Sequence, residues 1–597
     1  MELKAALHDT GQWEATGALI TGIAKEIRAD FINIDRYMDI NTNHLQWLLT
    51  DTAEKNPYTS DLFYNCCTLI AFSEVILKDE GNRVVFCEDE GLIKQMENIA
   101  AQKGKRLTIP DTKRQSGNPD AMLTKLLRMG KDHLEASAIR FLCLLSWVRE
   151  YRLVKRALPL KRIAAKRTSE APDVILMVWA TPTTFKSGGK LANHSFYGPL
   201  PMLLNDAGLN VWYLAAPVSW VFGIADILEN IRRSKDVVLV PTALANPRQC
   251  IAFLLKTWLN GIRIKRPIVL SKTDITDLVR SELEKEKKKV SPLRAFLFFS
   301  FCEFLRKQDI QAKTLIFPYE GQPWEKGLEF GLKRYSCRIK TAGYQHTPIS
   351  DFWMGCFPSR LDREAGIYPD TIITIGNAWK KKFSDSGIPA ERLRVGPALR
   401  FIHLCESKPD EEIDARPDPT NANAVLVAPS ISYDEAFELL HKTVAALWAE
   451  TDLRVYIKFH PSMAGSGKKL IEDMLRISSA DRLPDHFRVT REETARLIKR
   501  VQVLICDYTS VADEALMAGV PVIELPSDIW FHMDKAGSYP GIIKTVTHAG
   551  ALADTVRELM AETEERRAAR VARTTPMLGD MFNFDMTDAA KLFALTR

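Results

Sequence analysis

Short runs of consecutive apolar residues, each followed by a stretch with helical spacing, recur along most of this chain. Asp173–Ala180, Thr314–Phe317, Ala424–Ala428 and Val503–Cys506 are clear examples. A strand that is apolar on both faces is typical of a parallel sheet covered by helices on both sides. Parallel strands are joined by crossover connections, which are right-handed in nearly all proteins. The pattern therefore predicts an α/β chain built on parallel sheets.

The same alternation is predicted for the first 120 residues. Asp30–Ile34, Arg83–Cys87 and Arg106–Ile109 are the expected strands, with helices over Leu62–Leu77 and Leu92–Ala101. Strands and helices that alternate at this spacing favour a parallel sheet. We therefore expect these residues to belong to the sheet of an N-terminal lobe and not to a separate domain.

Residues 406–423 divide the chain into two α/β parts. They contain three prolines, several acids and the sequence Asn421-Ala422-Asn423, a composition typical of a linker. A chain of 597 residues is long enough for about three folding units. We expect an N-terminal lobe over residues 1–405 and a C-terminal lobe over residues 424–597, the latter ending in a charged helix at Asp554–Ala569.

A basic helical insertion, residues 119–170, interrupts the first lobe. Between Arg149 and Arg167 there are eight basic residues and one acid, with aromatic and aliphatic residues interleaved. Such a stretch suits an anionic membrane surface. The alternative is a solvated helical connector whose apolar residues pack on the body of the protein, and Pro159 excludes a single long helix.

Charge and hydropathy narrow the partners and the location. The formal net charge of +6 comes from 81 basic and 75 acidic residues, and this small excess does not argue for a nucleic-acid partner. The first residues lack the basic start and apolar run of a signal peptide, and no apolar stretch approaches the length of a membrane span. We expect a cytoplasmic protein, at the inner face of the cell membrane if the basic insertion binds lipid.

Site residues are expected directly after the strands, because ligands of open α/β sheets bind at the carboxyl ends of strands. One such place is Lys458-Phe459-His460-Pro461, at the end of the predicted strand Arg454–Phe459. The proline stops the chain from continuing in the sheet, and the histidine could meet a phosphate. A lone histidine here is also common as a structural or surface residue.

A second place is Asp507-Tyr508-Thr509-Ser510, between the strand Val503–Cys506 and a helix. The hydroxyls of Thr509 and Ser510 lie where a helix cap is expected. The start of a helix also offers N–H groups and a positive dipole end to an anion. Glu514, four residues later, shares the face of Ser510 and could accept hydrogen bonds from ribose hydroxyls. The alternative is a capped helix without a ligand.

These motifs, with the later Ala518-Gly519-Val520-Pro521-Val522-Ile523, resemble the C-terminal lobe of GT-B glycosyltransferases. The pattern is most similar to bacterial enzymes with cytidine-nucleotide donors, such as capsule sialyltransferases and Kdo transferases, and to the CDP-glycerol polymerases of teichoic-acid synthesis. The resemblance implies two Rossmann-like lobes whose parallel sheets face a central cleft. It also implies that His460 contacts the donor phosphate and that Thr509 and Ser510 lie on the same phosphate. The predicted donor site consists of these three residues with Lys458, Pro461, Asp507 and Glu514.

The resemblance further implies a catalytic acid in the N-terminal lobe. The sialyltransferases carry a short motif of two acids and a glycine, which here corresponds to Tyr319-Glu320-Gly321 and departs from it at Tyr319. Asp89-Glu90-Gly91 matches the motif better in letters and also follows a predicted strand. We prefer Glu320, because the flanking Gln322 and Trp324 are the polar and aromatic residues that a sugar site needs, but both candidates stay open.

His346 is the second catalytic candidate. It ends the sequence Gly343-Tyr344-Gln345-His346 after a predicted strand. A Gln-His pair at this place recurs in the teichoic-acid and capsule enzymes that the chain resembles, although the glycine that commonly follows is Thr347 here. His346 could position the acceptor or transfer a proton. A hydrogen-bonded core histidine is the alternative.

These features predict sugar transfer from a nucleotide-activated donor, with a CMP-linked ulosonic acid expected, to a surface-polysaccharide or lipid-linked acceptor. Capsule, O-antigen and lipopolysaccharide synthesis are the expected settings. We expect no metal and no cofactor besides the donor substrate, because no Asp-x-Asp or His/Cys cluster is suitably placed. The alternatives are a CDP-linked polyol-phosphate transferase, a nucleotide-sugar epimerase on the same fold, and a non-catalytic scaffold of polysaccharide assembly.

Overall fold

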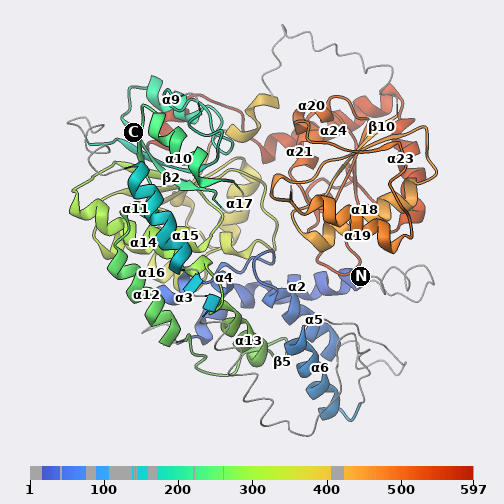
Figure 1. Ribbon diagram of the computed structural model, residues 1–597. Helices are drawn as coiled ribbons and strands as arrows, with labels where there is room; N and C mark the ends of the chain where they lie inside the picture. The colour runs from blue at the N-terminus through green and yellow to red at the C-terminus, as the bar shows by residue number, and fades with distance from the viewer. Residues whose placement is uncertain are drawn as a thin grey trace.

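Two parallel sheets form the framework of the molecule (Figure 1). The computed structural model describes residues 16–39, 44–74, 89–105, 138–139, 141–142, 144–158, 171–186, 188–219, 222–259, 261–404, 423–463 and 465–595. Within them, one sheet has seven strands and the other has six. Every pairing within these two sheets is parallel. The prediction of an α/β chain with two parallel sheets is confirmed.

The first sheet is built from residues 174–395. Its strands follow the order β3-β2-β1-β6-β7-β8-β9, so that the chain runs outward from β1 to one edge, returns, and runs outward to the other. This is the doubly wound order, in which a ligand binds where the direction reverses. The strands are β1 (Val174–Ala180), β2 (Val211–Pro217), β3 (Val237–Leu239), β6 (Thr314–Pro318), β7 (Lys340–Gln345), β8 (Thr371–Thr374) and β9 (Leu393–Val395).

The second sheet repeats this arrangement in residues 424–545. Its order is β12-β11-β10-β13-β14-β15, which again reverses next to the first strand. The strands are β10 (Ala424–Ala428), β11 (Arg454–Ile457), β12 (Phe487–Val489), β13 (Val503–Cys506), β14 (Val522–Glu524) and β15 (Lys544–Thr545). The two Rossmann-like sheets expected from the sequence are therefore both present.

Helices cover both faces of the second sheet, as its uninterrupted apolar strands require. Val425 and Val427 of β10 point into one buried cluster, and Ala424, Leu426 and Ala428 point into another. The first cluster is completed by α18 (Tyr433–Leu447), α19 (Gly467–Ile477) and α23 (Leu552–Met560), and the second by α20 (Thr494–Ile498) and α21 (Val511–Met517). Alternate residues of each strand thus reach opposite sides.

One of the helices of this part of the chain begins directly after the turn that contains Glu320. The most extensive helix pair is α14 (Ser291–Lys307) with α15 (Pro323–Arg334). Gly331 permits this approach, since a Cβ there would lie 2.8 Å from the carbonyl oxygen of Phe299. The other helices of this part are α9 (Leu200–Asp206), α10 (Ile224–Arg233), α11 (Pro241–Leu244), α12 (Pro247–Leu259), α13 (Thr276–Glu286), α16 (Arg360–Ala365) and α17 (Asn377–Asp385).

The first strand predicted from the sequence, Asp30–Ile34, is wrong. The helix α2 (Gly17–Ile32) and a 3-10 turn at Ile34–Tyr37 occupy these residues. Ile20, Ala24, Ile27 and Phe31 are buried at helical spacing, which overrides the local strand pattern.

The described part of residues 16–105 contributes helices to the fold and no strand, so the expected sheet is not found there. Besides α2 they are α3 (His44–Leu48), α4 (Asp51–Glu54), α5 (Leu62–Glu74) and α6 (Glu90–Gln102). The predicted strands Arg83–Cys87 and Arg106–Ile109 lie outside the described residues. So do residues 406–422 of the predicted linker and most of the insertion 119–170, and the proposed domain boundaries stay a prediction.

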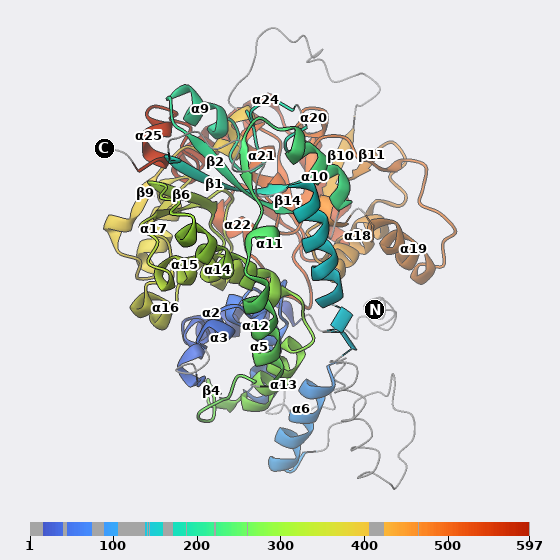
Figure 2. The ribbon, with the colours of Figure 1, turned by 60° about the vertical axis from the view of Figure 1, so that its left-hand side comes forward.

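The end of the chain returns from the second sheet to the first, as the two views of the ribbon show (Figure 1 and Figure 2). The predicted helix Asp554–Ala569 is two helices, α23 and α24 (Glu564–Met581), because Thr563 caps a new helix by accepting a hydrogen bond from the amide of Arg566. The helix α24 contacts both α21 and α17. The hydroxyl of Thr314 then donates to the carbonyl oxygen of Ala594, beside α25 (Ala589–Phe593), at 2.7 Å.

Candidate active site

Glu320 lies in a tight turn directly after β6. The carboxylate of Glu325 accepts hydrogen bonds from the amides of Glu320 at 3.1 Å and Gly321 at 2.9 Å. Gly321 has a φ of +73°, and a Cβ there would overlap the carbonyl of Gly355. A glycine is therefore required after Glu320, and the turn holds the glutamate in one position.

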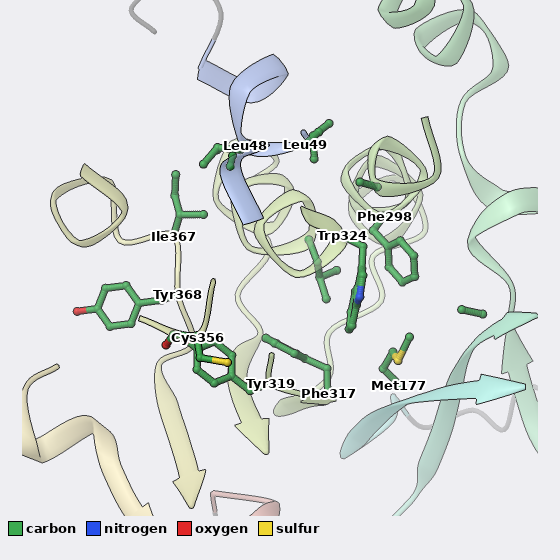
Figure 3. Close-up of a cluster of buried hydrophobic side chains, with 14 of the residues drawn as sticks. Leu48, Leu49, Met177, Phe298, Phe317, Tyr319, Trp324, Cys356, Ile367 and Tyr368 are labelled. Atoms are coloured by element: carbon green, nitrogen blue, oxygen red, sulfur yellow. The ribbon is translucent and has the colours of Figure 1, made fainter. Parts of the chain in front are cut away.

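The departure from the resembled motif at Tyr319 has a structural reason. The Tyr319 side chain is buried, and its hydroxyl donates to the carbonyl oxygen of Cys356 at 3.0 Å. Figure 3 shows its ring in the cluster of buried apolar side chains, beside Cys356. An acid at this position would be buried among apolar groups, so Tyr319 serves packing and Glu320 is the single acid of the motif.

The structure brings the two predicted catalytic residues together. His346 follows β7, and its Nε2 lies 3.7 Å from Oε1 of Glu320. The side chain of Gln345 links the turn after β7 to the end of β8. It donates to the carbonyl oxygen of Thr347 at 2.6 Å and accepts from the amide of Ile375 at 3.1 Å. Glu320 and His346 thus face each other from neighbouring strands, although they are distant from each other in sequence.

Burial sets the protonation of this pair. It holds the pKa of His346 well below its usual range, and the charge of Arg400 and the nearby His194 act in the same direction. Phe196 stacks on the imidazole with ring centroids 4.2 Å apart. Burial raises the pKa of Glu320, whereas Arg400 and the hydrogen bond from Gln322 oppose the rise. The imidazole of His346 is therefore neutral at neutral pH, and the carboxyl group of Glu320 keeps its proton up to a higher pH than an exposed glutamate does.

In the second sheet, His460 follows β11 as predicted. Its Nδ1 accepts a hydrogen bond from the amide of Ser462 at 3.2 Å and lies 2.7 Å from the Ser462 hydroxyl. Desolvation, Arg400 and Lys458 lower the pKa of His460, in that order. The neutral ring then carries its proton on Nε2, which is the atom left to donate to a ligand. Pro461 begins a 3-10 turn, Pro461–Met463, after β11 has ended at Ile457.

The Thr509–Ser510 turn departs in detail from the expected cap. The Thr509 hydroxyl accepts a hydrogen bond from the amide of Val511 at 3.3 Å, and the Ser510 side chain makes no capping bond to α21. Glu514 lies one turn into α21, and burial raises its pKa to about 7, with Arg400 opposing and Asp513 reinforcing the rise. These side chains lie at the same sheet edge as His460, because β11 and β13 both flank β10.

Asp507 ties the strands together and is buried. Its carboxylate accepts from the amide of Ser430 at 3.0 Å, which joins the end of β13 to the loop after β10. Asp513 of α21 is also buried. Lys535 pairs with it at 2.5 Å, and the Tyr539 hydroxyl donates to the same carboxylate at 2.6 Å. These buried contacts fix the position of α21 and of the residues at its start.

Arg400 is a site residue that the sequence analysis missed. Its charge acts on Glu320 and His346 from the first sheet and on His460 and Glu514 from the second. It lies in a 3-10 turn, Leu399–Leu404, that follows β9 and contacts α21. A pattern of residues directly after strands does not include it, because four residues, Gly396 to Leu399, separate it from the end of β9 at Val395.

The turn before Arg400 is fixed by a buried tyrosine. The Tyr344 hydroxyl donates to the carbonyl oxygen of Pro397 at 2.9 Å and accepts from the amide of Leu399 at 2.9 Å. Tyr344 belongs to the sequence that ends in His346. One strand, β7, therefore positions both the imidazole and the guanidinium.

The competing motif Asp89-Glu90-Gly91 has a different environment. Asp89 caps α6 by accepting from the amide of Leu92 at 2.8 Å, and it pairs with Lys285 at 3.0 Å. The helix α6 packs on α5 and α13 and belongs to the N-terminal helices. Asp89 thus has a structural role that accounts for the acid at the start of this helix.

Comparisons with known proteins do not identify the reaction. No protein-family model matches the sequence, and a search of curated proteins finds no match. Among solved structures, the fold is similar to Staphylococcus aureus MnaA with UDP, at 12% identity and a TM-score of 0.42 over 71% of this chain and 98% of that chain.

Two further structures are similar to the same extent. One is a putative UDP-N-acetylglucosamine 2-epimerase from Listeria monocytogenes, with 10% identity and a TM-score of 0.43 over 71% of this chain and 94% of that one. The other is Anabaena Alr3699/HepE in complex with UDP, with 12% identity and a TM-score of 0.39 over 71% of this chain and 98% of that one. At these values the similarity assigns no activity.

Proposed function

We propose that this protein is a glycosyltransferase that uses a nucleotide-activated sugar. The observation that supports this most is the position of Arg400, whose charge reaches two ionisable groups on each side of the site. A cation between a carboxyl–imidazole pair and a set of donors suits a reaction in which negative charge develops on a leaving phosphate. A CMP-linked ulosonic acid is our first candidate for the donor.

In this proposal the second sheet holds the donor. His460 donates from Nε2 to the phosphate, Thr509 and Ser510 contribute hydroxyls, and Glu514 accepts from the ribose. Asp507 and Lys458 act indirectly, through the position of the strand ends. Within the described residues no group of three or more His, Cys, Asp or Glu side chains could hold a metal ion. We propose that Arg400 and His460 stabilise the phosphate charge.

The first sheet would provide the acceptor side. Glu320 takes the proton of the acceptor hydroxyl in the inverting form of the reaction, and neutral His346 orients that hydroxyl. In the retaining form Glu320 would stabilise the sugar cation or attack it. The acceptor in this proposal is a surface polysaccharide or a lipid-linked glycan.

Nucleotide binding tests the donor site. We expect His460→Ala to weaken binding of the preferred nucleotide about tenfold or more, the loss expected when a hydrogen bond to a charged group is removed. Calorimetric titration of CMP, CDP, UMP, UDP and GDP measures this. His548→Ala is the matched control, because His548 follows β15 of the same sheet and is exposed.

The preferred nucleotide distinguishes the candidate functions. Preference for CMP supports the ulosonic-acid donor, preference for CDP supports the polyol-phosphate transferase, and preference for UDP or GDP supports a hexosyltransferase or an epimerase. No binding by any nucleotide would contradict the proposal and favour the scaffold.

We also propose that the protein contacts an anionic membrane through the helix at residues 144–157. Arg149, Arg152 and Lys155 are exposed on it, and so are Leu145 and Leu153, while Trp147 is buried against the body. Exposed apolar and cationic side chains on one helix favour a lipid surface. Within the described residues no helix is long and apolar enough to cross a membrane. Lys161, Arg162, Lys166 and Arg167, which extend the basic stretch, lie outside the described residues.

A vesicle flotation assay tests the membrane contact. We expect Leu145→Ser with Leu153→Ser to reduce flotation with phosphatidylglycerol vesicles severalfold, because both apolar side chains would otherwise enter the lipid. Val489→Ser with Val571→Ser removes two exposed apolar side chains elsewhere and should not change it. Equal flotation of all variants would contradict the membrane contact and support the alternative, a solvated helical connector.

A further inference from the structure

A cavity of about 460 Å³ lies at the carboxyl edge of the first sheet. Its wall includes residues at or near the ends of four strands: Trp179 in β1, Pro217 in β2, Thr242 after β3 and Trp324 after β6. The strand order reverses between β1 and β6, and doubly wound sheets bind ligands at such a point. The volume is within the range of about 300–1,000 Å³ for small-molecule sites.

Glu150 brings a carboxylate to the cavity wall. Its Oε1 accepts a hydrogen bond from the hydroxyl of Thr242 at 3.1 Å, and its Oε2 accepts one from the hydroxyl of Ser219 at 3.4 Å. Both hydroxyl residues also line the cavity, so the carboxylate lies at the wall between them. Glu150 and Ser219 are partly exposed, and a ligand in the cavity can therefore reach this group.

The charge of Glu150 has no counter-ion among the described residues, with none of which it forms an ion pair. The two other acids of the wall differ from it. Asp51 pairs with Lys289 at 3.1 Å, and burial raises the pKa of Glu54 to about 8, so that Glu54 is mostly neutral at pH 7. Arg294, the one basic residue among those that line the cavity, is exposed to solvent.

This unpaired carboxylate selects the charge of a ligand. A molecule that fills the cavity displaces water from Glu150, and a charge that loses its water needs a counter-charge. An uncharged alkyl chain would leave the carboxylate unpaired, and an anion would be repelled by it. A cation would replace the lost water with a charge-assisted contact.

Indole rings form another part of the wall. Trp179 is partly exposed and meets Trp324 edge to face, with ring centroids 5.7 Å apart. Trp324 in turn contacts Phe298, with centroids 4.9 Å apart, as Figure 3 shows. Trp147 is the third indole of the wall. Tryptophan is the aromatic residue that attracts a cation most strongly to the face of its ring. Indoles beside a carboxylate therefore suit an ammonium group with apolar substituents.

We propose that this cavity binds a small organic cation, with its ammonium group beside Glu150 and its alkyl groups against the indoles. The inference goes beyond the proposed sugar transfer and does not depend on it, because none of the predicted donor or catalytic residues lines the cavity.

Calorimetric titration of the full chain with matched cationic and neutral probes tests this inference. Choline is compared with dimethylbutanol, its isostere in which carbon replaces the nitrogen, and ethanolamine is compared with propanol. We expect at least one cation to bind about tenfold more tightly than its neutral counterpart, as for one hydrogen bond or contact to a charged group. The two pairs distinguish a quaternary from a primary ammonium ligand.

Substitutions locate the bound cation. Glu150→Gln should weaken its binding about tenfold, because glutamine keeps the size of the side chain and lacks the charge. Glutamine can still bond with the hydroxyls of Ser219 and Thr242, so Tm should hardly change. Trp179→Leu should weaken binding about threefold or more, as for the loss of one cation–π contact. Glu303→Gln is the matched control and should not change the affinity, because Glu303 is a partly buried carboxylate of α14 that does not line the cavity.

Three results would overturn the inference: neither cation binds, each cation binds no more tightly than its neutral counterpart, or Glu150→Gln binds the cation as tightly as the unchanged protein does. The comparison of cationic with neutral probes needs only the unchanged protein, so it decides the inference even if a variant does not fold. Failure here leaves the proposed sugar transfer standing, since the nucleotide titration concerns other residues.

Discussion

Replacing Glu320 by glutamine should lower the rate of sugar transfer about 10²–10⁴-fold, the usual contribution of a general base. Glutamine keeps the size of the side chain and cannot take a proton from the acceptor. The amides of Glu320 and Gly321 would still donate to Glu325, so the turn should persist. Nucleotide affinity should remain within about twofold of that of the unchanged protein, since the donor residues belong to the other sheet.

Asp89→Asn is the control for this experiment, because Asp89 belongs to the competing acid motif. It should leave the transfer rate unchanged and lower the free energy of unfolding by about 1 kcal/mol, through the weakened cap of α6 and the lost pair with Lys285. A large rate loss in Asp89→Asn together with an active Glu320→Gln would reverse the assignment of the two motifs.

Replacing Arg400 by glutamine should lower kcat/KM about 10²-fold or more and weaken nucleotide binding as well. A guanidinium that contacts a phosphate provides strong charge-assisted hydrogen bonds. The substitution should also move the pH dependence. Arg400 lowers the pKa of Glu320, so its removal raises that pKa further.

The direction of this pH shift follows from the role of the base. Glu320 must be ionised to accept a proton, so kcat/KM falls as the pH drops below its pKa. In the unchanged protein this fall should occur above the ordinary value of 4.5, because burial raises the pKa. In Arg400→Gln it should occur at still higher pH. Arg400→Lys should restore most of the pH profile, and Arg394→Gln, an exposed arginine in β9, should change neither rate nor profile.

An unshifted profile in Arg400→Gln would show that the guanidinium does not act on the catalytic base. Loss of activity with unchanged nucleotide affinity would place Arg400 on the acceptor side only. Either result would remove the main support for a guanidinium that acts on site residues of both sheets.

The sequence predicted the second sheet better than the N-terminal region, for a physical reason. The strands β10 and β13 are buried on both faces, and their uninterrupted apolar runs leave little choice of structure. Asp30–Ile34 also reads as a short apolar strand, but it ends a helix whose buried residues are spaced over four turns. Local runs are ambiguous between strand and helix when tertiary packing decides.

The site shows a similar contrast between local and distant determinants. Glu320 and His346 could be predicted because each directly follows a strand and belongs to a short motif. Their 3.7 Å approach depends on the pairing of β6 with β7, which no local pattern encodes. Arg400 acts from a 3-10 turn that a buried tyrosine hydroxyl fixes across the sheet.

The most direct test of the account is the proton NMR spectrum of nucleotide sugars during incubation with the protein and a lipid-linked glycan acceptor. CMP-N-acetylneuraminic acid, CMP-Kdo and UDP-N-acetylglucosamine are the donors to compare. We expect one donor to lose its sugar, with release of the free nucleotide and a new glycosidic signal on the acceptor, and we expect Glu320→Gln to prevent this. A sugar that changes its configuration while it stays attached to the nucleotide would identify an epimerase and contradict the proposed transfer.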